Sequence, residues 1–367
     1  MVSLRYPPVA GSVQTLPPVP RLTRLTQSSN RSRRNSSVTT TIQRPLSCTI
    51  VHSRDGCSLD RDNRNPNREE VYHQEESPSS DESARSANQN EMIYKETSYM
   101  NVLPNRASFY RDYGTCTTLG RGNFSRVFLL NSGQNKQAVK EIDKERMSGR
   151  LDYVYNEVNI LAECDHENIC KLFKAFESPG YFFLVFEYAP FGDLFEFIKQ
   201  TGIPGEANCA CLTYQICSAL EYIHNKQIVH RDVKPENILI MSESWVKLTD
   251  FGLACTVLGP LYRVCGTPTY VAPEVISEQG YGREVDIWSL GVVLHIMLIG
   301  FAPFRAPRRS QLFKLIRKAY LGFDFPRWSH ISTNAQSTVR RMLCPNPKRR
   351  ATATEILEDE WIQSFLV

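Results

Sequence analysis

The sequence predicts an α+β fold with two lobes, a small β-rich N-lobe and a larger helical C-lobe, preceded by a disordered tail. Up to about residue 108 the chain has few periodic apolar positions, which is typical of disorder. From 110 to 188 short apolar runs rich in β-branched and aromatic residues indicate strands, and the last third reads as helical. A chain of 367 residues, 41% of them hydrophobic, is long enough for such a domain and a tail.

The expected tail, residues 1–108, is rich in Ser, Arg and Pro, and its charge is segregated. Up to Arg68 the formal charge is +8, and from Glu69 to Ser108 it is −5. A solvated linker and a regulatory segment are both compatible with this composition. The run Leu16–Arg21, LPPVPR, suits a polyproline II helix, so an SH3-type or other regulatory partner is one alternative.

Composition excludes several classes of protein. The formal charge of +4 is small for this length and does not indicate a nucleic-acid partner. The 11 cysteines lack paired C-x-x-C spacings, so we expect free thiols in a reducing compartment. The N-terminus has no apolar signal core, and the most apolar segment, Ile287–Phe304, is interrupted by His295 and Pro303 and favours a buried helix over a membrane span. We therefore expect no membrane partner and a cytoplasmic location, with the nucleus as an alternative.

A glycine-rich stretch begins the expected N-lobe. Gly120 and Gly122 lie in LGRGNFSRV, where missing side chains allow the backbone N–H groups to approach phosphates. A hairpin turn is the simpler interpretation of this stretch alone. The next strand, Gln137–Lys140, ends in a lysine at the spacing that a phosphate-covering loop requires. Together the two motifs predict a nucleotide site.

The rest of the N-lobe supplies an expected partner for Lys140 and a hinge. Apolar residues at helical spacing run from Leu151 to Leu161, and Glu157 lies beside that stripe. It is expected to pair with Lys140, although a solvated surface glutamate is the alternative. The run Tyr181–Tyr188 indicates a buried strand, and the Pro- and Gly-containing segment after it, Ala189–Asp193, indicates a hinge between the lobes.

The segment Ile228–Ile240, IVHRDVKPENILI, brings three chemical groups into one loop between two short strands. Asp232 suits the proton of a hydroxyl group, Lys234 the charge of a phosphate, and Asn237 a metal ion. Downstream, Asp250 stands at a strand end beside Phe251 and Gly252, where its side chain can also reach a metal. Asn237 and Asp250 are therefore expected to hold Mg²⁺ on the β- and γ-phosphates of ATP.

These motifs occur in the order seen in eukaryotic protein kinases, which the sequence resembles over residues 110–365. The resemblance implies a protein-kinase fold with an N-lobe at 110–188 and a C-lobe at 193–365, and a buried ion pair between Glu274 and Arg350. Lys234 and Thr267 match the serine/threonine-specific form. The nucleotide-contacting residues that the resemblance implies are Leu119, Gly120, Gly122, Val127, Ala138, Lys140, Glu157, Glu187, Ala189, Asp193, Leu239 and Asp250.

Within the kinases, GPLYRVCGTPTYVAPE and GYGREVDIW resemble the calcium/calmodulin-dependent group, and most closely its doublecortin-like branch. Nothing in the first hundred residues resembles a doublecortin domain. The chain stops at Val367, just after the last expected helix, so we expect no calmodulin-binding helix and no direct calmodulin binding. Where many relatives have an activating phosphothreonine, this chain has Arg263, so activity should not require phosphorylation at that position.

The expected activity is transfer of the ATP γ-phosphate to serine or threonine hydroxyls of protein substrates. Asp232 would accept the hydroxyl proton, and Lys234 would stabilise the transferring charge. Glu196 and Glu236 would favour substrates with a basic residue upstream of the acceptor. The alternative from another class is a pseudokinase adaptor that binds nucleotide or partners without catalysis.

Overall fold

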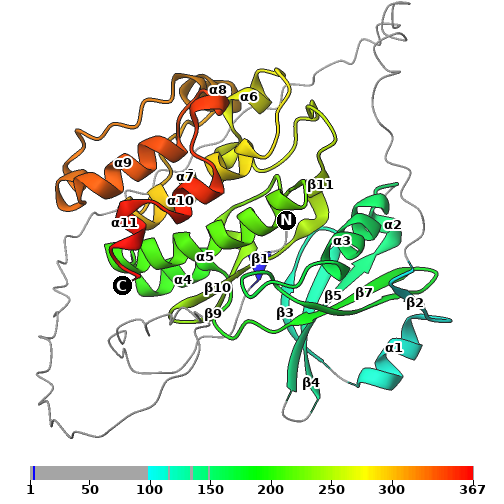
Figure 1. Ribbon diagram of the computed structural model, residues 1–367. Helices are drawn as coiled ribbons and strands as arrows, with labels where there is room; N and C mark the ends of the chain where they lie inside the picture. Colours follow the sequence, from blue (N-terminus) through cyan, green and yellow to red (C-terminus); the bar gives the residue numbers. More distant parts are fainter. Residues whose placement is uncertain (1–2, 5–97, 115, 133–134, 148, 367) are drawn as a thin grey trace, which may run out of the picture. The chain divides into compact units, whose positions relative to one another are not determined.

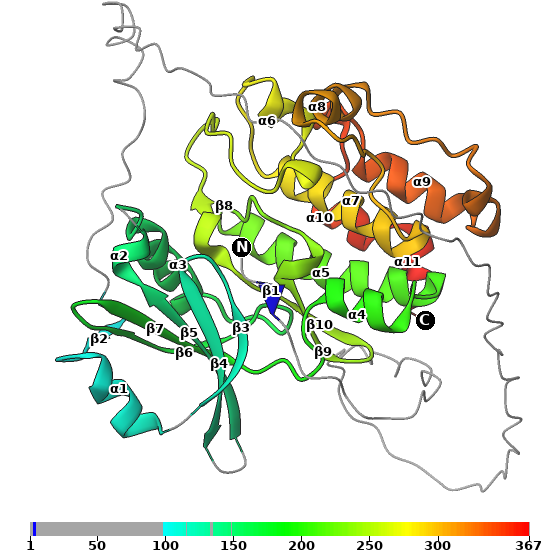
Figure 2. The same ribbon diagram turned by 180° about the vertical axis from the view of Figure 1, so that it is seen from behind.

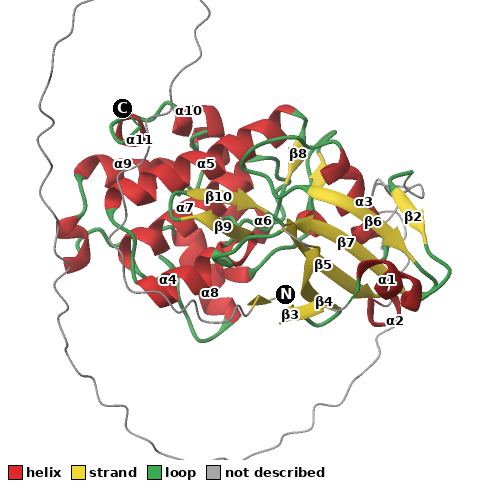
Figure 3. Cartoon of the chain, turned by 90° about the horizontal axis from the view of Figure 1, so that it is seen from below, coloured by secondary structure: helices red, strands yellow, loops and turns green. Residues whose placement is uncertain are grey.

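The computed structural model describes residues 3–4, 98–114, 116–132, 135–147 and 149–366. They belong to one of the two units into which the chain separates, Met1–Leu22 with Ile93–Val367, whereas the other unit, Thr23–Met92, lies outside the described residues. Figures 1 and 3 show a lobe built around a β-sheet and a lobe built of helices. The predicted α+β fold with a β-rich N-lobe and a helical C-lobe is confirmed.

The N-lobe is organised around one sheet with the strand order β1-β3-β4-β5-β7-β6-β2. Neighbouring strands are antiparallel, except that β2 runs parallel to β6. The strands are β1 Ser3–Leu4, β2 Met100–Val102, β3 Cys116–Arg121, β4 Ser125–Ser132, β5 Asn135–Asp143, β6 Leu172–Glu177 and β7 Tyr181–Glu187. The helices of this lobe are α1 Arg106–Tyr113, α2 Lys144–Met147 and α3 Asp152–Ala162.

Strand β7 shows how the sheet is covered on both faces. All its residues from Phe182 to Phe186 are buried, and they alternate between two hydrophobic clusters. Phe182 and Leu184 belong to the large core that also contains residues of α3. Phe183 and Val185 belong to a smaller cluster with Phe109 of α1. Because successive strand residues point to opposite faces, α3 and α1 cover opposite sides of the sheet.

Helix α1 corrects the predicted boundary of the domain. Its Phe109 is fully buried and stacks on Phe183 with the ring centroids 4.1 Å apart. Arg106 and Tyr110 both bond the Glu141 carboxylate, at 2.7 and 2.8 Å. The prediction that residues up to 108 form a disordered tail is therefore wrong for β1, β2 and the start of α1. The rest of that prediction falls mainly outside the described residues.

The C-lobe contains the remaining elements (Figures 1 and 2). Its helices are α4 Leu194–Thr201, α5 Glu206–Asn225, α6 Pro273–Ile276, α7 Glu284–Ile299, α8 Arg309–Lys318, α9 Thr333–Met342, α10 Ala353–Leu357 and α11 Glu360–Gln363. Two short strand pairs, β8 Ile228–Val229 with β11 Cys255–Thr256 and β9 Ile238–Ser242 with β10 Trp245–Leu248, bracket the loop predicted to be catalytic. The sequence segment between β8 and β9 is thereby pinned at both ends.

Helix α7 forms the centre of the C-lobe. Its residues are buried on nearly every side, from Val285 to Ile299, and the helix ends at Gly300 in a left-handed conformation (φ 89°). The prediction of a buried helix in this apolar segment is confirmed. In the part of the chain that the structure describes, no helix is long and apolar enough to cross a membrane.

The expected ion pair between Glu274 and Arg350 is present and buried in the C-lobe. Arg350 donates to both carboxylate oxygens, at 2.6 and 2.9 Å, and the side chains are 3% and 0% exposed. Further bonds from the guanidinium reach the backbone carbonyl oxygens of Cys344 and Glu284, each at 2.9 Å. The buried charges are thus fully paired within the fold.

Candidate active site

The loop predicted to be catalytic is held by Asp286, a fully buried residue of α7. Its carboxylate accepts hydrogen bonds from the backbone N–H groups of His230, at 2.9 Å, and Arg231, at 2.8 Å. A third bond joins it to His224, at 2.9 Å. Arg231 has a left-handed backbone (φ 67°), which is strained for a residue with a side chain, so these bonds hold the loop in its bent form.

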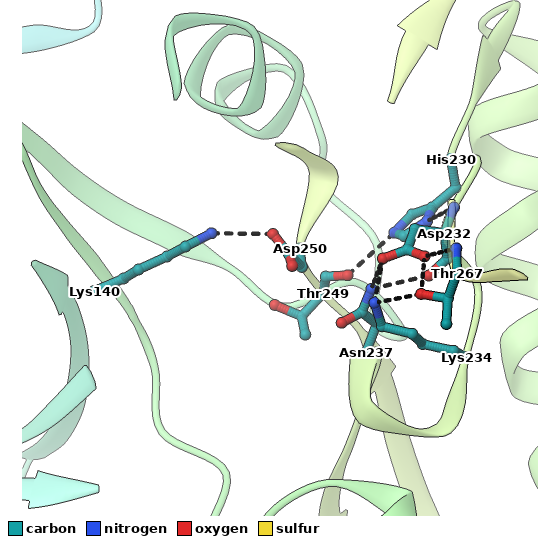
Figure 4. A network of polar contacts seen from close by, with 8 residues as sticks. All are labelled: Lys140, His230, Asp232, Lys234, Asn237, Thr249, Asp250 and Thr267. Atoms are coloured by element: carbon teal, nitrogen blue, oxygen red, sulfur yellow. Dashed lines mark hydrogen bonds and ion pairs between the residues drawn. The ribbon is translucent and has the colours of Figure 1, made fainter. Parts of the chain in front are cut away.

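His230 connects the loop to Thr249 and to the backbone of Asp232. Its Nε2 lies 3.1 Å from the backbone oxygen of Thr249, which can only accept, so Nε2 carries the proton. Its Nδ1 then accepts from the backbone N–H of Asp232, at 3.3 Å. Burial lowers the pKa of His230 below its ordinary value, which agrees with a neutral ring. Figure 4 shows the ring between Thr249 and Asp232.

Asp232 is at the centre of a network of donors (Figure 4). Its Oδ1 accepts from the backbone N–H and the hydroxyl of Thr267, at 3.1 and 2.9 Å. Its Oδ2 accepts from Lys234 and from the Asn237 amide, the latter at 3.2 Å. Lys234 also donates to the Thr267 hydroxyl, at 3.1 Å. The structure therefore brings the three predicted catalytic residues together, and Thr267 contacts Asp232 and Lys234 as the family resemblance implies.

A second group of charges lies around Lys140, on β5 of the N-lobe. Its ammonium donates to both oxygens of Glu157 on α3, at 3.0 and 2.9 Å, and to Asp250 Oδ1, at 3.0 Å. The predicted pair is present, and the alternative of a solvated Glu157 is wrong, since this side chain is only 3% exposed. One ammonium thus faces two carboxylates.

The pKa values of these carboxyls reflect that imbalance. Burial and the nearby Asp250 raise the pKa of Glu157 above its ordinary value. For Asp250, whose side chain is partly exposed, partial burial opposes ionisation, but the charge of Lys140 outweighs it and holds the pKa at about 2. The site therefore keeps an excess of negative charge beside the lysine, which suits the arrival of a cation.

A cavity of about 250 Å³ joins the two groups. Lys140, Glu157, Asp232 and Asp250 all line it, so charges from both lobes face one space. Its wall also contains residues that the sequence did not single out for this site, namely Asn123, Phe124, Met147, Arg150 and Tyr153. Among them, Arg150 lies over the ring of Phe124, in the glycine-rich stretch, with 4.7 Å between guanidinium carbon and ring centroid.

The other predicted nucleotide-contacting residues in the N-lobe lie on strands beside Lys140. Val127 pairs directly with Lys140 across β4 and β5, and Ala138 lies two residues before Lys140, so the three share one face of the sheet. Leu119 is buried on β3, and Gly120 pairs with Val127. Gly122 follows β3, and its N–H donates to the Ser125 carbonyl oxygen at 2.8 Å, which closes a turn between β3 and β4. Lys140 lines the 250 Å³ cavity, whereas none of these other five residues does.

The predicted hinge residues connect β7 to the C-lobe. The Glu187 carboxylate binds Lys247 at 2.8 Å, so its side chain takes part in an ion pair. Ala189 is buried, and no acceptor among the described residues receives its backbone N–H. Asp193 caps α4 by accepting from the N–H of Glu196, at 2.9 Å, and it forms a bridge with Leu239 on β9.

The predicted metal ligands fit a hard cation. The Asn237 side chain donates through its nitrogen to the Asp232 backbone oxygen, at 2.9 Å, and no donor among the described residues contacts its Oδ1. Asp250 is ionised and has the left-handed backbone (φ 62°) that places it beside Lys140. Amide and carboxylate oxygens are the ligands that Mg²⁺ prefers. Across the described residues, no cluster of three His, Cys, Asp or Glu forms a complete metal cage.

Comparisons with known proteins agree with this geometry. The protein kinase domain family matches residues 113–362. The chain is 42% identical over 266 residues to the serine/threonine-protein kinase DCLK3 of Homo sapiens, covering 70% of this chain and 41% of that protein. It is 40% identical over 264 residues to DCLK1 of Rattus norvegicus, covering 70% of this chain and 61% of that protein.

A third relative, DCLK2 of Rattus norvegicus, is 43% identical over 252 residues, covering 66% of this chain and 33% of that protein. The chain thus spans less than two thirds of the length of each of these relatives. The matched region is the part that carries the two groups of charges and the cavity between them. The chain therefore belongs to the protein kinase domain family, and within it the chain is similar to the serine/threonine-protein kinases named DCLK.

Proposed function

We propose that this protein is an active serine/threonine kinase that transfers the γ-phosphate of ATP to protein substrates. The observation that carries the proposal is the shared cavity, because Asp232 from one lobe and Lys140 from the other line the same space. A phosphoryl transfer needs a base beside the accepting hydroxyl and positive charge beside the phosphates. Both are present and held by hydrogen bonds within the fold.

The residues act on the reacting atoms in defined ways. Asp232 orients the substrate hydroxyl and accepts its proton, while the hydroxyl oxygen bonds to the γ-phosphorus and the bond to the bridging oxygen of ADP breaks. Lys234 stabilises the charge of the transferring group, and Lys140 positions the α- and β-phosphates. Asn237 Oδ1 and Asp250 would hold Mg²⁺, which supplies further positive charge to the phosphates when bound.

A group of carboxylates supports a preference for basic residues in the substrate. One oxygen of Glu236, in the loop beside Asp232, is buried without a hydrogen-bond partner among the described residues. Burial, together with the charges of Glu196 and Glu236, raises the pKa of Asp193 to about 6. Glu196 is paired with Lys199 at 3.2 Å, but the buried oxygen of Glu236 has no such partner among the described residues. Unpaired negative charge of this kind is stabilised by an incoming lysine or arginine. The substrate would place that side chain upstream of the acceptor.

The test is transfer of labelled phosphate from Mg-ATP to a serine/threonine peptide library by the full chain and by Asp232→Asn. We expect the substitution to lower kcat by about 10²–10⁴-fold, because it removes the base, and to leave ATP affinity within about threefold. Asp165→Asn is the matched control, since that carboxylate is 92% exposed. If the protein is a pseudokinase adaptor, none of the three proteins will transfer phosphate. Retained turnover in Asp232→Asn would refute the role of Asp232 as the base.

Two further expectations concern the cell rather than the chemistry. We propose a location in the cytoplasm or the nucleus, on the grounds of composition, and a fluorescent fusion that concentrates elsewhere would contradict it.

We also propose that the run Leu16–Arg21, which lies outside the described residues, binds an SH3-type domain. Loss of binding after Pro17→Ala and Pro20→Ala substitution, measured with purified SH3 domains, would support this.

A further inference from the structure

Arg263 occupies the position at which, by the family resemblance, many relatives have a phosphothreonine, and it makes a specific contact. Its Nη2 donates to the hydroxyl of Tyr153, and its guanidinium carbon lies 5.2 Å from the centroid of that ring. The two residues are 110 positions apart in the sequence. A hydrogen bond and a cation–π contact therefore join the segment after Asp250 to the N-terminal half of α3.

Tyr153 connects this contact to the site. It lies four residues before Glu157 on α3, so the two side chains are on the same face of the helix. Tyr153 and Glu157 also line the same cavity as Lys140. A tether at Tyr153 therefore restrains the turn of helix that holds Glu157 against the lysine.

The other end of the tether is anchored by the fold. The backbone oxygen of Arg263 accepts from the Tyr281 hydroxyl at 2.6 Å, and Leu261 forms two backbone bonds with Tyr281, at 2.9 and 2.8 Å. Tyr262 packs against Gly280, where an added Cβ would lie 3.1 Å from the ring. Arg263 thus extends from a fixed stretch of backbone.

Arg231 needs no phosphate to be held in place. Its Nε donates to the backbone oxygen of Leu253 at 2.6 Å, in the short helix Phe251–Leu253 that follows Asp250. Its own backbone is fixed by Asp286. The Arg231 guanidinium is therefore already bound within the fold, and a second cation, Arg263, contacts Tyr153 of α3.

We propose that Arg263 and Tyr153 form a latch that keeps α3 and the segment after Asp250 in the active arrangement without phosphorylation. The latch rests on the proposed kinase function and explains how the activity would be controlled without phosphorylation. Arg263 is a positioning residue, since it acts on Lys140 through Tyr153 and Glu157. The latch consists of a cation on the segment and an aromatic hydroxyl on the helix, so exchange of the two side chains should preserve it.

The experiment uses the full chain after phosphatase treatment, with kcat and KM for ATP measured at a fixed peptide concentration. Arg263→Ala should lower kcat/KM for ATP by about fivefold, because a hydrogen bond and a cation–π contact are lost. Arg263→Lys and Tyr153→Phe each keep part of the contact and should lose less. The exchange Arg263→Tyr with Tyr153→Arg should restore most of the loss, which a merely structural role for either residue would not produce.

Arg309→Ala is the matched control, because Arg309 also lies over an aromatic ring, Phe313, at 5.0 Å, on a helix remote from Lys140. It should leave kcat/KM unchanged. Hydrogen exchange in residues 152–162 gives a readout that does not depend on activity, and Arg263→Ala should accelerate it. If exchange accelerates but the wild-type protein transfers no phosphate, the proposed function fails while the latch stands.

Three results would overturn the latch itself. The first is wild-type kcat/KM and wild-type hydrogen exchange in Arg263→Ala. The second is no recovery in the exchanged double variant when thermal unfolding shows that it is folded. The third is a phosphatase-treated wild-type protein that is inactive and regains activity on phosphorylation of Thr256 or Tyr262.

Discussion

Two groups of charges in this protein kinase domain are built from similar residues but differ in how completely they are paired. In the C-lobe, Arg350 and Glu274 form a one-to-one pair with almost no exposed surface, and the remaining guanidinium donors have backbone acceptors. At the cleft, Lys140 faces both Glu157 and Asp250, and the Asp250 side chain is 38% exposed. The first group is complete, whereas the second has a surplus of negative charge.

This difference separates a structural from a functional role. A buried pair with every donor satisfied offers nothing to a ligand, and removal of one partner leaves an uncompensated charge in the core. A group with surplus carboxylate oxygen gains stability only when a cation or a phosphate-bound metal completes it. Substitution in the C-lobe pair should therefore change folding, and substitution at the cleft should change catalysis.

The largest change in stability is expected for Arg350→Met, which leaves Glu274 buried and unpaired. The free energy of unfolding should fall by about 3–5 kcal/mol. Urea denaturation followed by fluorescence measures it, with Arg349→Met as the control, because Arg349 is the exposed neighbour in the sequence. Addition of Glu274→Leu to Arg350→Met should recover part of the loss. If the two single variants have the same free energy of unfolding, the ion pair does not stabilise the fold.

At the Lys140 group we expect the reverse pattern, a loss of catalysis with little loss of stability. The test is Glu157→Gln, which keeps the shape of the side chain and removes its charge. Lys140 then retains only Asp250 as an ionic partner and is less firmly directed at the phosphates. We expect kcat/KM for ATP to fall about tenfold to a hundredfold, with a change in unfolding free energy below about 1 kcal/mol. Glu163→Gln, an exposed position at the end of the same helix, is the control. A large loss of stability with unchanged kinetics would show that the Lys140–Glu157 pair is structural rather than functional.

Local motifs explain which parts of the site could be predicted from the sequence. Asp232, Lys234 and Asn237 lie within six positions of one another between two apolar runs, so short-range spacing was enough to group them. The pair between Lys140 and Glu157 needed the family resemblance as well, since a glutamate beside a helical stripe can equally face solvent. The confirmed fold class follows from the same combination of strand and helix patterns.

The parts that the sequence did not reveal depend on contacts between distant positions. Helix α1 is only eight residues long, and its order comes from the burial of Phe109 against the sheet rather than from a helical pattern. Tyr153 lies outside the apolar stripe of α3, and its partner Arg263 is far along the chain. No local rule predicts such pairs, because only the folded chain brings them together.

The smallest expected effect concerns the carboxylates around Asp193 and sharpens the idea of surplus charge. Its pKa of about 6 means that Asp193 is ionised at pH 7.5 and protonated at pH 5.5, whereas an ordinary aspartate would stay ionised at both. A lysine or arginine in the substrate keeps its charge throughout, so KM for a basic peptide should rise about threefold as the pH falls through 6. Asp193→Asn keeps an oxygen to cap α4 and should abolish this rise, and a peptide without basic residues should not show it. If the rise persists in Asp193→Asn, another group controls the binding of basic substrates.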